Sequence, residues 1–594
     1  MIQKRLDKLR HTLRNKGFKA IIIYPSDPHQ SEYLTEYWKM RDWITGFTGS
    51  AGTAVITLNE AGLWTDSRYF IQAESELKGS GIKLFRTGEK GVPDIAAWLK
   101  QQLSSGDKVY WVAETISVSQ RKHFNAKLED KGILLHTGPD IFDELWVNRP
   151  ELPMSKIYEH PIEFAITSVS EKLIALRAQM EEMKADYFFT SAVDETAWLL
   201  NLRGSDVDCN PIFLSCLLLS SASVSLFVEI EKIDSILKDK LKAAGIELKP
   251  YKSVQSVVSK LTESSKIWID PTVLNCEIYD TISCKTIESR SPVMHMKAVK
   301  NAAQIAHLQN AMTKDGIALF KAFRWLKDEV SKREVKESDF AKKIASFRST
   351  QDHYVGESFS AIVGYKGNGA IVHYHPSPEN SALIKQGGML LVDSGGQYFD
   401  GTTDITRTIH LGSPSKEEKQ NFTLVLKGMI ALSLAVFPEG TSGAQLDILA
   451  RQFLWKQGLN FGHGTGHGVG YFLNVHEPPQ GFVPQITSER GKTILMEGMI
   501  TSNEPAYYKA GEYGIRSENL IVAKSGPHNN FLHFETLTLY PFDRNLIDVS
   551  LLSSEEINWL NNYHQMVFER LSIGLTESEQ EELSLECTPI SSEN

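Results

Sequence analysis

The chain has 594 residues, of which 42% are hydrophobic and 23% are charged, a composition typical of soluble globular proteins. With about 100–200 residues in an ordinary domain, this length predicts roughly two to four domains. Acidic residues outnumber basic ones by 73 to 63, so the net charge is −10. That balance argues against nucleic acid as the main partner, because phosphate binding requires concentrated Lys and Arg.

The N-terminal residues 1–19 have the pattern of a basic amphipathic helix, with Leu6, Leu9 and Leu13 on one side. They lack the continuous apolar stretch of a secretion signal. The apolar run 212–219 is too short to span a bilayer, so we expect no membrane partner. The five cysteines are odd in number and form no CxxC pair, which indicates reduced thiols and a cytoplasmic localisation.

Two segments of the chain are similar to one another. The first runs from RLDKLRHTLRNK through KAIIIY to WITGFTGS at 43–50, and the second from VSEKLIALRAQMEEMK through YFFTSAV to WLLNLRGS at 198–205. Each pattern predicts an amphipathic helix, a buried strand and a second strand that begins at a Trp. We therefore predict two domains of similar α/β build.

Prolines mark the expected domain boundaries. Segment 146–161 contains three of them, which excludes a regular helix interior or central strand there. A second boundary falls near Ser291 and Pro292, before a long helical pattern. The predicted domains are 1–150, 151–296 and 297–594, and the last includes a C-terminal extension from about 540 to 594.

The last third has a mixed α+β pattern. We predict helices over about 298–330, 337–351, 416–437 and 444–457. Strand-like runs lie among them: FSAIVGY, GGMLLVDSG, DITRTIHL, GMITSNEP and ENLIVAK. Most of the informative His, Asp and Glu residues are in this region, so the functional site is expected here.

Three aspartates follow one another in the stretch LVDSGGQYFDGTTDI. Asp393 ends an apolar strand, Asp404 begins the next, and Asp400 precedes a glycine in a turn dipeptide. A hairpin would bring Asp393 and Asp404 together, and two like charges are costly unless a proton or a cation lies between them. Such a pair alone is more often a turn-and-cap arrangement than a metal site, and Asp400 is expected to be only a turn residue.

Three histidines follow in HGTGHGVGYFLNVHE, namely His463, His467 and His476. Two histidines four residues apart invite comparison with zinc proteases, in which both lie on one helix face. The intervening glycines disfavour a helix, and no Glu follows His463. The glycines instead allow a tight backbone that crowds side chains at one point.

Two further acids, Glu504 and Glu518, lie at the inner ends of another predicted strand pair. With Asp393 and Asp404 they carry four negative charges, which two divalent cations would balance beside a neutral imidazole and a bridging hydroxide. Oxygen-rich ligation favours Mn²⁺, while Co²⁺ and Zn²⁺ remain possible.

These residues resemble the metallopeptidase family with the "pita-bread" fold, which includes methionine aminopeptidases, prolidases and aminopeptidase P. The family's ligand order implies the metal ligands Asp393, Asp404, His467, Glu504 and Glu518. Nearly the whole chain resembles the long, three-domain cytosolic aminopeptidase P, on motifs that include PSDPHQSEY, WLLNLRGSDVDCNP, NGAIVHYHP, SNEPAYY and GIRSEN. The resemblance implies two creatinase-like α/β domains followed by a pita-bread catalytic domain, and a homodimer.

The same resemblance implies a metallo-exopeptidase that hydrolyses the first peptide bond of peptides with proline as second residue. Two metals would activate a bridging water, and Glu504 would accept its proton. His463 and His476 would contact substrate, donate to the oxyanion or carry protons, and His373 would help to hold the proline. Arg516 would order a ligand carboxylate. The alternatives are a structural role for His373 and a surface salt bridge for Arg516.

Three competing functions share parts of this pattern. A prolidase, which cleaves only Xaa-Pro dipeptides, has the same metal motif, but the length and the duplicated N-terminal domains favour aminopeptidase P. A non-catalytic binding protein with this fold would have lost ligands, and a creatinase-type amidinohydrolase needs no metal. The complete set of five ligands argues against both.

Overall fold

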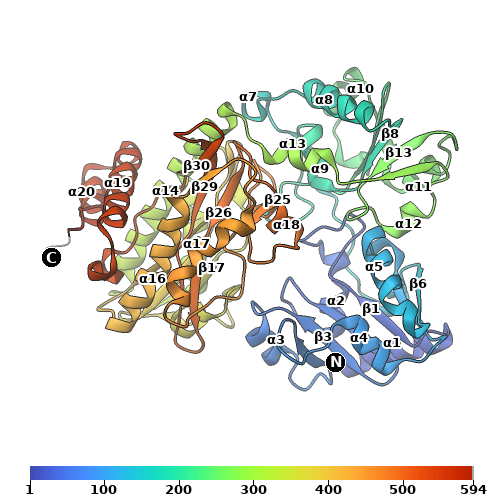
Figure 1. The fold of residues 1–594 in the computed structure, drawn as a ribbon, viewed down its shortest axis with the longest axis horizontal. Helices are drawn as coiled ribbons and strands as arrows, with labels where there is room; N and C mark the ends of the chain where they lie inside the picture. The colour runs from blue at the N-terminus through green and yellow to red at the C-terminus, as the bar shows by residue number, and fades with distance from the viewer. Residues whose placement is uncertain (592–594) are drawn as a thin grey trace. The chain divides into compact units, whose positions relative to one another are not determined.

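The computed structural model describes residues 1–591, and its contacts divide the chain into two compact units. The first consists of residues 1–162 and 167–293, and the second of residues 163–166 and the chain from 294 onward (Figure 1). Within residues 1–591, no helix combines the length and the apolar character needed to cross a membrane.

The first unit contains two six-stranded sheets of identical topology. The orders are β4-β3-β2-β1-β5-β6 and β12-β11-β10-β8-β13-β14. In each, the first strand in sequence pairs antiparallel with the next strand of the sheet and parallel with the fifth. The strands are β1 Ala20–Ile23, β2 Thr53–Thr57, β3 Ala61–Thr65, β4 Lys83–Arg86, β5 Lys108–Val112, β6 Leu134–Gly138, β8 Tyr187–Thr190, β10 Cys216–Ser220, β11 Val224–Val228, β12 Ile246–Pro250, β13 Lys266–Ile269 and β14 Lys285–Glu288.

Helix α1 (Ile2–Asn15) and helix α8 (Val169–Glu182) precede the first strand of each half, as the repeat predicts. Leu6, Leu9 and Leu13 of α1 are buried. The other helices that lie wholly within this unit are α2 Met40–Thr45, α3 Phe70–Glu76, α4 Ile95–Gln102, α5 Val118–Leu128, α6 Phe142–Leu145, α9 Val193–Leu199, α10 Ser235–Ala243, α11 Val254–Val258 and α12 Cys276–Tyr279.

The prediction of a Trp-led strand in each half is wrong. Trp43 lies in α2 and Trp198 lies in α9. In α2 the apolar residues Met40 and Ile44 are four positions apart and bury one helix face, so the apolar run satisfies its burial as a helix. Gly46 then ends α2 in the left-handed conformation, with φ of 77°.

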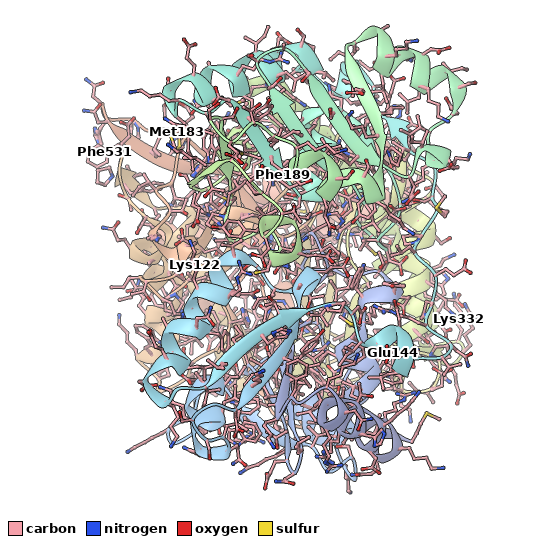
Figure 2. The ribbon with its side chains drawn as sticks, turned by 90° about the vertical axis from the view of Figure 1, so that its right-hand side faces the viewer. Lys122, Glu144, Met183, Phe189, Lys332 and Phe531 are labelled. Atoms are coloured by element: carbon pink, nitrogen blue, oxygen red, sulfur yellow. The ribbon has the colours of Figure 1, made fainter. Side chains whose placement is uncertain are left out.

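The two halves of the first unit share a core and a backbone junction. Val118 N–H donates to the Leu274 carbonyl at 3.0 Å, and Cys276 N–H donates to the Ile116 carbonyl at 2.9 Å. Val118 packs in the same buried cluster as Phe189 of β8, a residue labelled in Figure 2. This reciprocal pairing of equivalent segments joins the two sheets in one compact unit.

The second unit is α+β, as predicted. Its long helices are α14 Ala302–Glu329, α15 Glu337–Arg348, α16 Lys416–Ser433, α17 Gly443–Trp455, α19 Ser554–Leu571 and α20 Glu577–Glu586. They accompany a sheet β17-β19-β22 and a sheet β23-β30-β29-β26-β24-β25. The strands outside the site are β15 Val335–Lys336, β16 Tyr354–Glu357, β17 Ile362–Tyr365, β18 Leu383–Ile384, β23 Val436–Pro438, β25 Glu477–Phe482 and β30 Phe531–Thr536.

All four predicted helices of the last third are shorter in the structure than in the sequence pattern, and the differences at α14 and α16 have clear causes. Helix α14 begins at Ala302 because Asn301 caps it in a reciprocal capping box with Gln304. Helix α16 ends at Ser433, and Phe437 lies in β23, where it pairs with Leu532 and is buried.

Candidate active site

Two nested hairpins carry the four predicted carboxylate ligands. In the first, β19 (Met389–Ser394) pairs antiparallel with β22 (Ile405–His410), with Asp393 opposite Thr406. In the second, β26 (Ile500–Asn503) pairs antiparallel with β29 (Asn519–Ser525), with Asn503 opposite Asn519. Each outer pair encloses an inner pair: β20 Gly396–Tyr398 with β21 Gly401–Thr402, and β27 Ala506–Lys509 with β28 Tyr513–Arg516.

Asp404 directly precedes β22, Glu518 directly precedes β29, and His467 comes from a third segment, yet each offers a ligand atom within 4.8 Å of the others. His467 Nε2 lies 3.5 Å from Asp404 Oδ2 and 3.5 Å from Glu504 Oε1. The charge of Asp393 acts on Asp404, Glu504 and Glu518, which places its carboxylate in the same neighbourhood.

His467 is oriented by its own backbone on β24 (Gly466–Gly468). Its Nδ1 lies 2.9 Å from the Gly468 carbonyl, and because a carbonyl only accepts, Nδ1 carries the proton. The lone pair of Nε2 then faces Asp404 and Glu504, as metal ligation requires. A Cβ at Gly466 would lie 1.8 Å from the Ser502 carbonyl, so the close strand approach requires glycine.

Without a counter-charge, the ionised form of these buried, neighbouring carboxylates is unfavourable. Burial, followed by the charges of neighbouring acids, raises the pKa of Asp404 and Glu518 well above the usual range. Burial also raises the pKa of Glu504 to about 7. Asp393 Oδ1 is buried without a hydrogen-bond partner. Converging acceptors with excess negative charge fit a pair of divalent cations.

Arg516 is buried, and its guanidinium contacts several groups of the site. Its Nη2 donates to Asp393 Oδ2 at 2.6 Å, and its Nε donates to Thr406 Oγ1 at 3.2 Å. Thr406 Oγ1 in turn donates to Glu518 Oε2 at 2.7 Å. One guanidinium therefore orders an acid of each hairpin.

The sequence did not point to Tyr508, which joins Arg516 to a histidine. Arg516 Nη1 donates to Tyr508 Oη at 2.5 Å, and Tyr508 Oη lies 2.9 Å from His463 Nε2. The His463 Nδ1 lies 2.7 Å from the Gly464 carbonyl and carries the proton, so Tyr508 donates to Nε2. Tyr508 lies opposite Gly514 on the paired strand, a relation visible only once the β27–β28 register is known.

The other two predicted histidines also lie in this unit. The rings of His476 and His467 are 4.3 Å apart in an edge-on arrangement. His373 lies between the short helix η6 (Lys366–Ala370) and β18. Its neighbour Tyr374 packs in a small cluster with Ile362, Leu391 and Tyr508.

Known proteins with similar sequences show the family to which this chain belongs. Aminopeptidase P2 of Arabidopsis thaliana is 40% identical over 96% of this chain and 86% of its own length. Xaa-Pro aminopeptidase 1 of Dictyostelium discoideum is 38% identical over 96% of this chain and 93% of its own length. This chain belongs to the aminopeptidase P family.

The family models cover this aminopeptidase P chain in order. Residues 5–142 and 148–304 match the creatinase/prolidase N-terminal domain, residues 306–525 match metallopeptidase family M24, and residues 530–590 match the C-terminal region of that peptidase. Two creatinase-like domains thus precede the pita-bread catalytic domain, which confirms the predicted fold class.

The aminopeptidase P fold is also shared with a solved structure. The X-prolyl aminopeptidase of Caenorhabditis elegans, described as a cytosolic enzyme with a di-nuclear active site, has a TM-score of 0.95 and 33% identity. The match covers 99% of this chain and 100% of that one.

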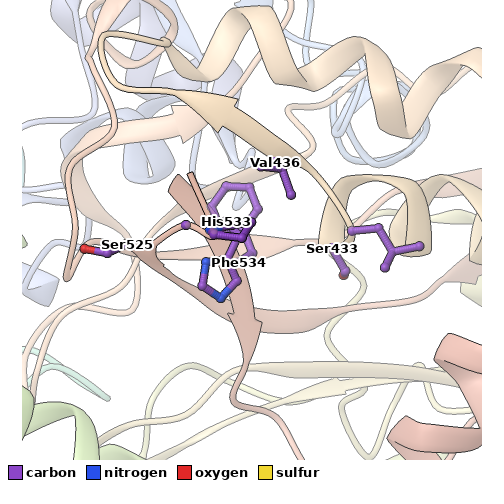
Figure 3. A pocket seen from close by; sticks show the side chains of 8 residues that line it. Ser433, Val436, Ser525, His533 and Phe534 are labelled. Carbon is purple, nitrogen blue, oxygen red and sulfur yellow. The ribbon is translucent and has the colours of Figure 1, made fainter. Parts of the chain in front are cut away.

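A hollow in the second unit of this aminopeptidase P chain is separate from the carboxylate cluster. It lies beside β23 and β30, and Figure 3 labels Ser433, Val436, Ser525, His533 and Phe534 among its lining residues. None of the predicted site residues lines it.

Proposed function

We propose that this chain is an Xaa-Pro aminopeptidase that releases the first residue from peptides with proline in second place. The convergence of Asp404, His467 and Glu518 carries the proposal, in a chain matched over 96% of its length by proteins named for this activity. An Xaa–Pro bond is a tertiary amide without an N–H and with a fixed φ, which makes a dedicated site plausible.

The residues proposed to hold two divalent ions are Asp393, Asp404, His467, Glu504 and Glu518. Bound ions supply Lewis acidity and lower the pKa of a water. The donor set has four carboxylates and one imidazole, which supports Mn²⁺ ahead of Co²⁺ and Zn²⁺.

The chain's own groups supply binding and proton transfer. Glu504 is proposed to accept a proton from the attacking water, since its Oε1 lies 3.5 Å from His467 Nε2 within the cluster. We assign substrate contact, donation to the oxyanion and proton transfer to His463 and His476, and the holding of the proline to His373. Donation by His463 requires that its ring give up its contact with the Gly464 carbonyl or with Tyr508. Arg516 keeps the carboxylate of Asp393 in place.

A prolidase is the alternative, and peptide length separates the two. We expect cleavage of Xaa-Pro-Pro peptides at the first bond, loss of activity with a chelator and recovery on addition of Mn²⁺. Cleavage restricted to Xaa-Pro dipeptides would favour a prolidase, and activity indifferent to the chelator would contradict a metallopeptidase.

We also propose a homodimer in the cytoplasm, with peptides rather than nucleic acid or membranes as partners, and domains at 1–150, 151–296 and 297–594. The cytoplasmic setting is supported by five free cysteines and by a structural neighbour described as cytosolic. Light scattering after size exclusion tests the dimer: a mass of one 66.7 kDa chain would contradict it.

A further inference from the structure

Glu337, the first residue of α15, has a carboxylate buried at 0% exposure. Within residues 1–591 it forms no ion pair with a Lys, Arg or His side chain. Four groups donate hydrogen bonds to it instead: Tyr365 N at 2.7 Å, Asn368 Nδ2 at 3.1 Å to both oxygens, Tyr374 Oη at 2.8 Å and Ala382 N at 2.7 Å.

A buried carboxylate without a cation is costly unless hydrogen bonds and local dipoles stabilise it. Glu337 has both, since it also occupies the first turn of a helix of 12 residues, where the helix dipole favours negative charge. All four donors belong to one stretch of chain, residues 365–382. The Glu337 carboxylate therefore holds several positions of this segment together through hydrogen bonds.

The β27–β28 hairpin also packs closely against this segment. A Cβ at Gly514 would lie 1.8 Å from the Gly369 carbonyl, and a Cβ at Gly367 would lie 2.9 Å from the Gly511 carbonyl. Tyr374 also packs in a cluster that Tyr508 of this hairpin contacts. The hairpin carries Tyr508 and Arg516, so the segment is fixed relative to the site.

We propose that Glu337 is a positioning residue for the reaction: its carboxylate holds segment 365–382 and thereby sets the position of His373. The inference rests on the proposed function, which gives His373 its role at the proline. Tyr374 makes the link direct, because it is the next residue after His373 and donates to Glu337 Oε2.

The test compares Glu337→Gln with Glu334→Gln, a matched change at an exposed acid three residues earlier. Glutamine keeps the shape but turns one acceptor into a donor that faces other donors. We expect Glu337→Gln to lower kcat/KM on an Xaa-Pro-Pro peptide roughly tenfold or more, because a small displacement of a substrate-positioning group is costly to the rate. The bound Mn²⁺ per chain stays at the wild-type value, and Glu334→Gln changes neither quantity.

A double variant separates positioning from general stability. If Glu337 acts through His373, adding Glu337→Gln to His373→Ala lowers kcat/KM no further than His373→Ala alone. Hydrogen exchange of peptides covering residues 365–382 becomes faster in Glu337→Gln, a readout that needs no activity. If Glu337→Gln does not fold, Tyr374→Phe takes its place. This variant removes one donor and keeps the ring, and we expect the same changes to a smaller extent.

Wild-type kcat/KM in Glu337→Gln, or in Tyr374→Phe if the first variant does not fold, overturns the inference. Effects that multiply in the double variant, or unchanged exchange over 365–382, also overturn it. A wild-type protein that cleaves no Xaa-Pro peptide with Mn²⁺ overturns the proposed function itself, and with it the role of His373.

Discussion

Asp400 and Asp404 differ by four positions and lie in opposite electrostatic surroundings. Asp404 faces other acids, whereas Asp400 is fully buried and accepts hydrogen bonds at 2.7 Å from Lys314 Nζ and from Asn310 Nδ2. The sequence placed Asp400 in a turn, where it lies. Its burial could not be predicted, because its partners are 86 and 90 residues away on α14.

Substitution of the two aspartates separates metal binding from stability. Asp404→Asn should lower the bound metal and reduce kcat/KM more than about 100-fold, beyond the cost of losing a supporting contact. Asp400→Asn leaves Lys314 uncompensated and should lower the free energy of unfolding by about 3 kcal/mol. Metal analysis and urea unfolding of both variants check this, and full metal binding by Asp404→Asn would contradict it.

The role of Tyr508 could not be predicted from the sequence. The pairing of Tyr508 with Arg516 arises from diagonal neighbours on β27 and β28, which depends on strand register rather than on spacing along the chain. The five predicted ligands, in contrast, were accessible because each flanks a strand or follows a glycine.

Tyr508→Phe should lower kcat/KM roughly tenfold or more, because it disconnects His463 from Arg516. The metal content should stay at the wild-type value. Tyr507→Phe on the alternate face of β27 is the control. Equal activity of the two variants, measured on one Xaa-Pro-Pro peptide, would count against the Tyr508 link.

At the scale of elements, the strands next to the predicted acids were predicted well, whereas the Trp-led segments were not. The strands β19, β22, β26 and β29 are short and almost wholly buried, and their β-branched residues favour a strand. Trp43 and Trp198 instead lie near the ends of α2 and α9, and within the two segments only β9 (Leu202–Arg203) is a strand.

Helix α19 stabilises the catalytic strands through one buried arginine. Arg407 of β22 donates to the Glu518 carbonyl at 2.6 Å and to Tyr563 Oη at 2.8 Å, and Tyr563 belongs to α19. Tyr563 Oη also donates to the Tyr540 carbonyl at 2.9 Å. The C-terminal extension thus supports the backbone of a predicted ligand.

Tyr563→Phe should therefore lower the free energy of unfolding by about 1–3 kcal/mol, since it leaves buried polar partners unsatisfied. Tyr24→Phe in the first unit, where the exposed ring makes no hydrogen bond among the described residues, should change it little. Denaturant unfolding of the second-unit transition checks this. Equal stability of Tyr563→Phe and wild type would exclude the supporting role.

At the scale of the whole molecule, the predicted site residues all lie between residues 373 and 518, within the second unit. The first unit repeats one α/β topology twice and supplies none of them. Domain order and fold class followed from internal similarity and motifs. The side-chain networks did not, because they join residues that are distant along the chain, such as Asp393 and Arg516, or residues that meet only through strand register, such as Tyr508 and Arg516.

Metal binding by the whole chain should depend on pH in a defined direction. The pKa of Glu504 rises from 4.5 to about 7 in the metal-free protein, so protons compete with metal below that value. Apparent affinity for Mn²⁺ should rise as pH increases through about 7, with release of protons on binding. Calorimetry at pH 6 and pH 8, in buffers of different ionisation enthalpy, measures the affinity and the number of protons released. A lower affinity at pH 8 than at pH 6 would contradict the prediction.

The most direct test of the central claim is anomalous diffraction from crystals grown with Mn²⁺. We expect two anomalous peaks, both within coordination distance of the cluster formed by Asp393, Asp404, His467, Glu504 and Glu518. A single peak, no peak, or peaks bound to other residues would contradict a dinuclear site at these hairpins.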